Sequence, residues 1–468
     1  MNSQVLEFSE CHSCSRVEEL EERIEELEEE NKELREKLTL KDEKIKRLHK
    51  KLRKYRNPHT PSSKRRGSTK SKSSSKSRGG RGRKKGHEGT TRLKPEPEQT
   101  IVVEEENCPQ CGTRLEEPRE VESKIIEDIP EPEPVVAKEY RIGHYECGDC
   151  GEAVIASHPD CPEEGRFGKN ALIQATLLKY EERIPYRKVS DLFEWQYDLE
   201  VSPASVLDFV RRTSDWLQPM YGNIWERIQN SDILYVDETG MKVDGEQHWI
   251  WAFTTGGETL VALRKSRGKK VLKEVLGKDF DGIIVCDGWS SYATYVKNVS
   301  PEACLQRCWA HLLRKVEDLA DKCEEAEPIS EKIHEIYENL TGFVGKDPPP
   351  KEREKRREKA EKELEKLLKK SYENERVEDL IKKIRNGKKY RLTFVTQPEV
   401  EPINNQAERA LREHVVHRRT IGGLRSQKGT ELHEIIMTLL TTWKQKERDP
   451  YKEMVKAMKC YKITIYLK

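Results

Sequence analysis

The sequence contains no long apolar run. Its first residues, MNSQVLEFSECHSC, lack the apolar core of a secretory signal. No later stretch approaches the 18 apolar residues that would suggest a membrane span. These absences predict a cytoplasmic protein with no membrane partner. Hydrophobic residues make up only 34% of the 468 residues and charged residues 37%, so long solvated segments are expected around a folded core.

Acidic residues are nearly missing from one segment. Residues 51–94 carry seventeen Lys or Arg against a single acid, Glu88, although the whole chain has a net charge of only +2. Such a segment condenses on phosphate backbones, and an RNA or a membrane surface would attract it too. With almost no apolar content, residues 57–98 are predicted to be a disordered basic linker. A merely solvated linker is the simpler interpretation, and both can hold.

Residues 17–55 repeat apolar side chains at alternating steps of three and four. Ten of the twelve positions visited from Val17 to Tyr55 are apolar, and charged residues fill most of the others. This heptad pattern predicts a coiled-coil dimerisation helix within residues 1–56. Asn31 falls on one apolar series and favours a parallel, in-register pair. The alternative is a lone charged helix.

The twelve cysteines point to metal ligands or buried thiols, because disulfides are rare in a reducing compartment. Two CxxC pairs predict a structural Zn²⁺ site in a zinc-ribbon-like domain over residues 99–160, although their 35-residue spacer is long for this motif. The stretches TIVVEEE and YRIGHYE beside the pairs are β-like. Cys11 and Cys14 could bind metal only across a dimer, and Cys161 is expected to be a free thiol. The four candidate zinc ligands are Cys108, Cys111, Cys147 and Cys150.

Residues 161–230 are predicted to be a helical DNA-binding region. After a first helix, residues 185–196 and 203–217 have helical patterns separated by a short turn. This order suits a helix-turn-helix, with Arg211 and Arg212 on the second helix facing DNA. A plain helical bundle is an equally good interpretation.

The pattern then changes to short β-rich runs, with helical stretches before and after the fourth. The first three runs can pair as a meander, while the later ones need helical crossovers and therefore lie parallel. We expect an α/β core with a mixed sheet, its first part over residues 231–317 and its last helices over 396–445. The β-rich runs are residues 232–243, 248–255, 259–266, 282–288 and 303–311.

Two further segments follow this first part of the core. Residues 318–395 are predicted to be a charged helical insertion, since sixteen of the twenty residues from 351 to 370 are charged. We expect a solvated arm that contributes nothing to the core. Residues 446–468 form a C-terminal tail whose pattern indicates no role.

Two aspartates follow apolar strand patterns. Asp237 comes after ILYV and Asp287 after IIVC. If these strands are neighbours, both carboxylates meet at one edge of the sheet, where α/β proteins usually have their sites. Two such carboxylates repel each other unless a cation lies between them, and hard oxygen ligands suit Mg²⁺ or Mn²⁺. The simpler interpretation of each aspartate alone is a turn residue or helix cap.

A third carboxylate is needed to complete a phosphoryl-transfer site. Glu408 lies in a basic helical stretch, one turn after Asn404 and Asn405. Glu401 precedes a proline in a loop, and Glu413 lies more than a turn further along, so both are poorer candidates. A surface ion pair is the alternative role for Glu408. The basic residues expected to hold DNA beside it are Arg409, Arg412, Arg418 and Arg419.

Taken together, these motifs resemble the DDE transposases of the insertion-sequence-66 family over nearly the whole chain. The resemblance implies a ribonuclease-H-like catalytic core with Asp237, Asp287 and Glu408 as its acidic triad. It also implies a zinc-binding and DNA-binding N-terminal region, and a helical insertion between the last two acids. The matching stretches are RKKGHEG, CPQCG, RFGKNALIQATLLKY, IPYRKVSDLF, YVDETGMKV, CDGWSSYA, CWAHLLRKVEDL and NNQAERALREHVVHRRTIGG.

Two smaller motifs lie close to the predicted triad. Cys308 and His311, in CWAH, are similar to a Cys-x2-His signature found near the site of several DDE transposase groups, and a packed thiol with a hydrogen-bonded histidine is the alternative. Trp289 and Tyr292 follow the second acid, where they could stack on a base or pack in the core.

The resemblance implies a transposase that cleaves and joins the terminal inverted repeats of its own element and a target DNA. It would be a prokaryotic, nucleoid-associated homodimer or larger synaptic oligomer, with or without accessory proteins of the same element. One alternative is a catalytically inactive zinc-binding regulator derived from a transposase. Another is a ribonuclease-H-like nuclease that resolves junctions.

Overall fold

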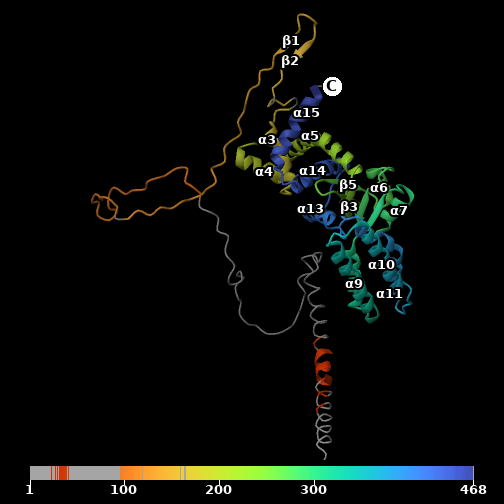
Figure 1. Cartoon of the computed structure of the whole chain (residues 1–468). Coiled ribbons are helices and arrows are strands. Elements are labelled where there is room, and N and C mark those ends of the chain that lie inside the picture. The colour runs from red at the N-terminus through yellow and green to blue at the C-terminus, as the bar shows by residue number, and fades with distance from the viewer. Residues whose placement is uncertain are drawn as a thin grey trace, which may run out of the picture. The chain divides into compact units, whose positions relative to one another are not determined.

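The computed structural model divides the chain into two compact units, Met1–Leu93 and Lys94–Lys468. Figure 1 shows the chain, with undescribed residues in grey. The structure describes residues 23, 27, 29, 31–39, 41, 95–118, 120–158, 160–162 and 165–466, with side chains up to Tyr461.

The described part of the first unit is helical. Asn31 donates a hydrogen bond to the Leu27 carbonyl at 3.2 Å, and Leu34 and Leu38 leave 51% and 61% of their surface exposed. An apolar stripe of this kind is what a coiled-coil seam needs. The rest of the heptad, residues 57–94 of the basic linker, and Cys11 and Cys14 lie outside the described residues.

The second unit begins with a segment that contains little regular structure. Its one hairpin pairs β1, His144–Glu146, with β2, Ala153–Ile155. The strand expected over TIVVEEE is absent from the described residues, and YRIGHYE is a strand only in its last three residues. Both stretches are exposed, so neither has the buried face that stabilises a strand.

Three helices follow, where the apolar periodicity predicts them. α3 spans Lys169–Tyr180, α4 spans Tyr186–Tyr197 and α5 spans Pro203–Gln229. The turn between α4 and α5 ends at Ser202, whose hydroxyl caps α5 by accepting a hydrogen bond from the Ser205 N–H at 3.1 Å. α5 runs twelve residues beyond the expected end, because its later apolar residues face the sheet core.

A five-stranded mixed sheet forms the centre of the second unit, in the order β5-β4-β3-β6-β7. β3, β4 and β5 pair antiparallel, whereas β6 and β7 lie parallel to β3. Helices α6, Lys269–Leu276, and α7, Ser290–Asn298, connect the later strands. The expected meander and parallel crossovers are confirmed. The strands are Ile233–Val243, Glu246–Thr254, Thr259–Arg264, Ile283–Cys286 and Cys304–Arg307.

Two strand predictions need correction. Asp237 does not end a strand but lies within β3, because the hairpin with β4 continues to Val243 after the pairing with β6 has stopped. The last β-rich run is a strand only to Arg307. The following CWAH instead begins α8, Trp309–Ala320, with Cys308 as its N-cap.

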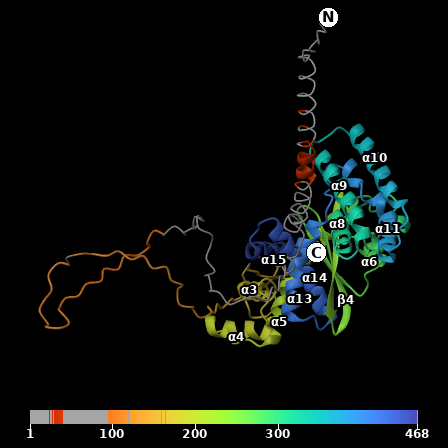
Figure 2. The ribbon, with the colours of Figure 1, turned by 90° about the horizontal axis from the view of Figure 1, so that it is seen from below.

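The sheet separates two hydrophobic cores. Leu234 and Ile284 face a core shared with α5 and α14, Gln427–Gln445, whereas Tyr235 and Val285 face the opposite core. This alternation is the period-2 pattern of strands that are buried on both faces. Figure 2 shows α13, Asn405–Ile421, and α14 on one side of the sheet, and α8 on the other; α13 packs on β4 and α14 on β5.

The prediction that the insertion contributes nothing to the core is wrong. Its helices α9, Glu327–Val344, α10, Pro350–Leu368, and α11, Glu375–Gly387, lie together beside the sheet (Figure 1). Their apolar residues form the second core with Tyr235 and Val285. The high charge of α10 obscured four apolar residues of its inner face, Ala360, Leu364, Leu367 and Leu368, which are buried.

The residues predicted to be a C-terminal tail include a packed helix. α15 spans Pro450–Tyr466 and contacts α5 and α3, and Met454 and Ala457 belong to the first core. Across the described part of the chain, no helix combines the length and hydropathy that crossing a membrane requires.

Candidate active site

The two candidate aspartates lie in matching positions on neighbouring strands. Tyr235 pairs with Val285 at the last register position shared by β3 and β6. Asp237 and Asp287 each come two residues later, so both belong to the sheet face that Tyr235 and Val285 occupy. The Asp287 Oδ1 accepts a hydrogen bond from the Trp289 N–H at 2.7 Å, which fixes the turn after β6.

Glu408 is brought to this edge by the start of α13. The buried Asn404 occupies the N-cap position of the helix and donates from Nδ2 to the Val236 carbonyl at 2.9 Å, next to Asp237. The Asn404 N–H donates to the Cys308 Sγ at 3.3 Å. Glu408 lies one turn later, with its N–H bonded to the Asn404 carbonyl. The asparagine thus joins α13 to both β3 and α8, while Asn405 is only the first helical residue.

The three carboxylates influence one another. Burial raises the pKa of Asp237 well above its usual range, and the charges of Glu238, Asp287 and Glu408 raise it further. Burial also raises the pKa of Glu408, against the charges of Arg314 and Arg412. Converging acids of this kind gain most from a cation between them. Hard carboxylate oxygens and their repulsion fit Mg²⁺ or Mn²⁺.

A second buried acid, Glu238, lies beside Asp237 on the other face of β3. Only 7% of its surface is exposed. It accepts hydrogen bonds from the Tyr292 hydroxyl and from the Arg267 Nε, the latter at 2.5 Å. Arg267 Nη2 also lies 3.9 Å from the Asp287 Oδ2. Arg267 therefore connects this acid to the second candidate ligand.

Two aromatic residues that sequence analysis grouped together have different environments. Tyr292 is fully buried and holds Glu238, so it is a core residue and not a surface for a base. Trp289 keeps 41% of its surface exposed. The Arg267 guanidinium lies 4.4 Å from its ring centroid and 4.8 Å from that of Trp249. Trp289 is thus held in place by Arg267, with exposed ring surface beside Asp287.

Glu408 also belongs to a second group of possible metal ligands. One ligand atom each from Cys308, His311 and Glu408 lies within 4.8 Å of the other two. The His311 Nε2 is 3.8 Å from the Glu408 Oε1. Cys308 is buried, and burial raises the pKa of its thiol. The expected pair of Cys308 and His311 therefore lies directly behind the third candidate acid.

The basic residues of α13 divide into two kinds. Arg409, Arg412 and Arg419 are exposed, as a DNA-contacting surface requires. Arg418 instead donates from Nη1 to the Gly240 carbonyl and to Thr239 Oγ1, so it fastens α13 to β3. The competing acid Glu413 accepts hydrogen bonds from Arg183 and Lys444, which explains it as a structural ion pair.

The two arginines of α5 also differ. Arg211 is exposed and pairs with Asp208 at 2.6 Å on its own helix. Arg212 is half-buried, and its Nη1 lies 3.0 Å from the position that a Cβ would occupy on Gly165. Of this pair, Arg211 has the freer surface.

The two CxxC pairs adopt the same local turn. The Cys108 N–H bonds the Thr113 carbonyl and the Cys147 N–H bonds the Glu152 carbonyl, both at 2.8 Å. Gly112 and Gly151 close the turns with φ values of +73° and +71°. Hydrogen bonding to Thr113 lowers the pKa of Cys111, and a backbone bond from Cys150 lowers that of Cys147. Among the described residues these four thiols do not meet at one point.

Behind Glu408, α13 is anchored by buried histidines. His414, His417 and His433 are at most 1% exposed, and His414 Nδ1 lies 3.3 Å from His433 Nε2. Burial lowers the pKa of His414 to about 3 and of His417 to about 4, the latter aided by the charges of Lys179 and Arg183. Burial also lowers the pKa of His433 well below its usual value.

This cluster should make stability fall in mild acid. The unfolded chain protonates these histidines near pH 6.5, whereas the folded protein does not until about pH 4 or below, so the unfolded state binds more protons. Their contribution is complete above about pH 6.5 and is lost as the pH falls, by up to about 1.4 kcal/mol per pH unit for each histidine. Urea unfolding between pH 5 and pH 7 measures it.

Buried carboxylates with raised pKa values change the unfolding free energy with pH in the opposite direction. The histidine contribution is therefore measured as the difference in pH slope between the wild type and a histidine variant. His414→Gln, His417→Gln or His433→Gln should each reduce the pH slope of the unfolding free energy by about one proton. The exposed His144→Gln is the control and should leave it unchanged. Equal slopes for the wild type and all three variants would exclude the histidine contribution.

Sequence analysis missed Glu238, Arg267 and Arg314. A signal for Glu238 was present, since it occupies an inward position in a strand that is buried on both faces. Arg267, in the loop after β5, and Arg314, on α8, carried no signal, because their partners come from distant segments.

Comparisons with known proteins identify relatives. A family model described as "Transposase IS66 family" matches residues 164–432. "Uncharacterized protein y4hP" of Sinorhizobium fredii is 23% identical over 395 residues, which cover 76% of this chain and 70% of that protein. "Uncharacterized protein y4qI" of the same organism is 26% identical over 320 residues, which cover 62% and 58%. The chain therefore spans less than two thirds of the second relative.

Proposed function

Because the chain belongs to the IS66 family of transposases, we propose that it cleaves and joins DNA at the terminal inverted repeats of its own element. The observation that carries this proposal is the position of Asp237 and Asp287, each two residues past the last pair shared by β3 and β6, with Glu408 brought beside them by Asn404. A sheet order with three antiparallel strands followed by two parallel ones supports a ribonuclease-H-like core.

Asp237, Asp287 and Glu408 would hold one or two divalent ions. Such ions supply an activated water or 3′-hydroxyl and stabilise the leaving oxygen of an in-line phosphoryl displacement. The protein's own residues do the remaining work. Arg267 orients Glu238 and lies beside Asp287, and the exposed face of Trp289 stacks on a base next to the cleaved bond.

DNA binding is assigned to several surfaces. Exposed Arg409, Arg412 and Arg419 attract the strand near the acids, and α4 with α5, including Arg211, contacts the terminal repeat. The basic linker adds sequence-independent affinity. The two cysteine turns would close around one structural Zn²⁺. The N-terminal heptads would form the homodimer, and DNA would bring further subunits into a synaptic complex.

The test is cleavage of DNA that carries the element's flanking inverted repeats, with Mg²⁺ or with EDTA. We expect Mg²⁺-dependent nicks at the repeat ends and joined products with target DNA. Specific binding of the repeats without cleavage would identify an inactive regulator. Cleavage of branched junctions, irrespective of end sequence, would instead identify a junction-resolving nuclease.

A further inference from the structure

A group of four positively charged side chains lies near Asp287. Arg307 ends β7, Lys315 lies on α8, Lys383 on α11, and Arg391 follows the short helix after α11. We refer to these four residues as the basic subsite. Burial lowers the pKa of Lys315, and the charges of Arg391, Lys383 and Arg307 lower it further, against the opposite effect of Asp287. Arg391, Lys383, Arg307 and Asp287 therefore all lie close enough to Lys315 for their charges to act on it.

The two arginines form the floor of the basic subsite. Arg307 and Arg391 are only 7% and 6% exposed, whereas Lys315 and Lys383 are exposed to solvent. Arg391 donates from Nη1 to the Cys308 carbonyl at 3.1 Å. The Nε of each arginine is buried without a hydrogen-bond partner. A buried donor that is left without a hydrogen-bond partner destabilises the folded protein.

Arg307 is held in position by the insertion. Its guanidinium lies 5.4 Å from the ring centroid of Tyr390. A Cβ added to Gly387 would lie 2.4 Å from Arg307 Nη1, so only glycine allows this approach. The insertion thus supplies both the walls around Arg307 and two of the four cations.

These charges lack acidic partners. In the part of the chain that the structure describes, no carboxylate forms a salt bridge with Arg307, Lys315, Lys383 or Arg391. Burial lowers the pKa of Arg391 to about 10, and the adjacent Arg307 contributes to this shift. Arg353, a buried arginine of the same insertion, shows the usual arrangement. It donates to Asp347 Oδ1 at 2.7 Å and to two carbonyls.

Two adjacent buried guanidinium groups without a carboxylate are costly, because buried charges are normally paired. An anion from outside the chain would provide the missing partner. Phosphate suits arginine, whose planar fork can donate two parallel hydrogen bonds.

Its position relative to the acids narrows the identity of that anion. Arg307 pairs in register with Cys286, the residue before Asp287. Lys315 Nζ lies 3.9 Å from the position that a Cβ would occupy on Gly288, the residue after Asp287. We propose that the basic subsite binds a backbone phosphate of the DNA strand held at Asp287, and that the helical insertion serves to complete it. This inference rests on the proposed function.

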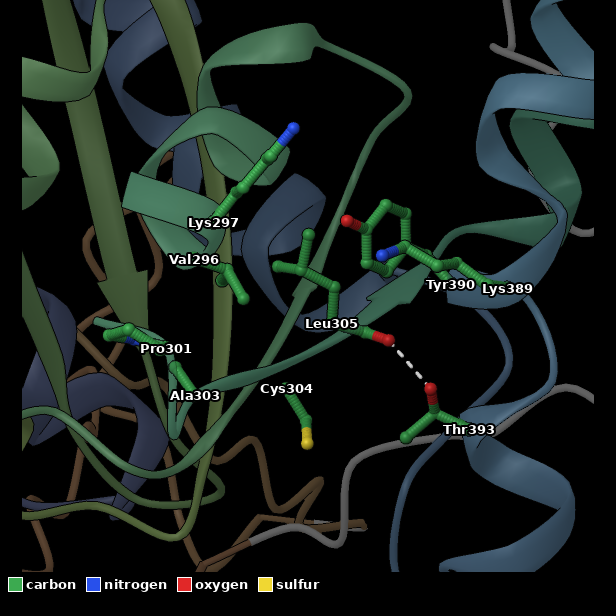
Figure 3. A pocket seen from close by; sticks show the side chains of 9 residues that line it. All are labelled: Val296, Lys297, Pro301, Ala303, Cys304, Leu305, Lys389, Tyr390 and Thr393. Atoms are coloured by element: carbon green, nitrogen blue, oxygen red, sulfur yellow. Dashed lines mark hydrogen bonds between the residues drawn. The ribbon is translucent and has the colours of Figure 1, made fainter. Parts of the chain in front are cut away.

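An adjacent pocket extends the same surface. Figure 3 shows this pocket, of about 360 Å³, between α7, β7 and the segment after α11. Lys297 and Lys389 line it, no acidic side chain does, and its wall includes Tyr390, the ring that carries Arg307. The pocket therefore adds two lysines next to the basic subsite.

The experiment compares Arg307→Met and the double variant Lys315→Gln/Lys383→Gln with the wild type. Thermal unfolding is followed without added anion and with about 20 mM inorganic phosphate. We expect phosphate to stabilise the wild type and to have little effect on either variant, because a ligand that binds only the folded state raises its stability. Lys332→Gln, on α9, is the matched lysine control and should retain the full phosphate effect.

Arg307→Met should also be at least as stable as the wild type without phosphate, since it removes one of two adjacent buried cations. Equal phosphate stabilisation of the wild type and both subsite variants would overturn the proposal. The double lysine variant keeps this test decisive if the core substitution fails to fold, since both lysines are exposed.

DNA binding distinguishes a DNA phosphate from a free one. The salt dependence of affinity for terminal-repeat DNA should weaken by about 0.7–0.9 in log–log slope for each phosphate that a variant no longer neutralises. An unchanged slope, with the phosphate effect on stability abolished, would overturn the assignment to DNA. If the wild type cleaves no DNA, the proposed function fails, while the thermal and binding measurements still decide on the basic subsite.

Discussion

We expect Asp237→Asn, Asp287→Asn and Glu408→Gln each to reduce DNA strand cleavage by about a thousandfold or more, with terminal-repeat binding reduced less than about threefold. Each substitution keeps the size of the side chain but removes a charged oxygen that would hold a divalent ion, and this ion stabilises charge that develops in the transition state. A gel assay of cleavage, with binding measured in Ca²⁺, separates the two effects.

The double variant Asp237→Asn/Asp287→Asn should be no less active than either single variant, since groups that act as a unit lose their effect together. Glu413→Gln is the matched control on the same helix. Glu413 pairs with Arg183 and Lys444, so its substitution should lower stability modestly and leave cleavage intact. A variant of any of the three acids that cleaves at the wild-type rate would remove that residue from the site.

The second large effect is expected from the basic linker. Replacing the Lys and Arg residues between positions 57 and 94 with Ser and Gln should weaken binding to DNA of any sequence by at least about a hundredfold at physiological salt. A protein that neutralises six to ten phosphates loses about 10³–10⁵ in affinity between 50 and 200 mM salt, so the variant should also show a much smaller salt slope. Titration of labelled duplex at several salt concentrations measures both quantities.

The control removes the same kind of charge from α10. The two cations to replace are Arg356 and Arg357, which pair with Glu363 and Glu354 on the same helix, so their charges are already partly neutralised within the protein. Replacing them should change the salt slope little. An unchanged slope in the linker variant would show that these residues separate domains without binding phosphate.

Much of the central sheet follows from local patterns. The apolar runs ILYV and IIVC predicted neighbouring strands with an aspartate beyond each, and β3 does pair with β6, with each aspartate two residues past the last pair that they share. The alternation of side chains along a strand, and the continuous apolar run of a strand that is buried on both faces, each involve only a few consecutive residues. Both patterns can therefore be recognised in the sequence. The position of Asp237 within a longer strand could not be, because it depends on a hairpin with β4 that continues past the parallel pairing.

The contacts that complete the site depend on distant residues. Asn404 donates a hydrogen bond to Val236, which lies 168 residues earlier in the sequence. Arg267, in the loop after β5, donates one to Glu238 of β3, which lies 29 residues earlier. The composition of the sequence does not indicate which distant residue either side chain will contact. The insertion was misjudged for a related reason, since charge dominates α10 while four apolar side chains of its inner face complete a core that begins on the sheet.

The cysteines show a different limit. The spacing of Cys108 with Cys111, and of Cys147 with Cys150, predicts two turns, and both form with a glycine of positive φ. Whether four thiolates share one ion depends on the segment between them, which has no regular structure over residues 120–143. A bound metal would supply the constraint that this segment lacks, because metal binding and folding are coupled in small metal-dependent domains.

Convergence of Asp237, Asp287 and Glu408 on one divalent ion can be tested by replacing Mg²⁺ with Fe²⁺ and mapping where ascorbate and peroxide cut the polypeptide. Radicals formed at bound iron cleave only the nearest backbone. We predict cuts beside residues 237, 287 and 408, all suppressed by excess Mg²⁺. Cuts beside Cys308, His311 and Glu408, with none beside Asp237 or Asp287, would contradict this assignment.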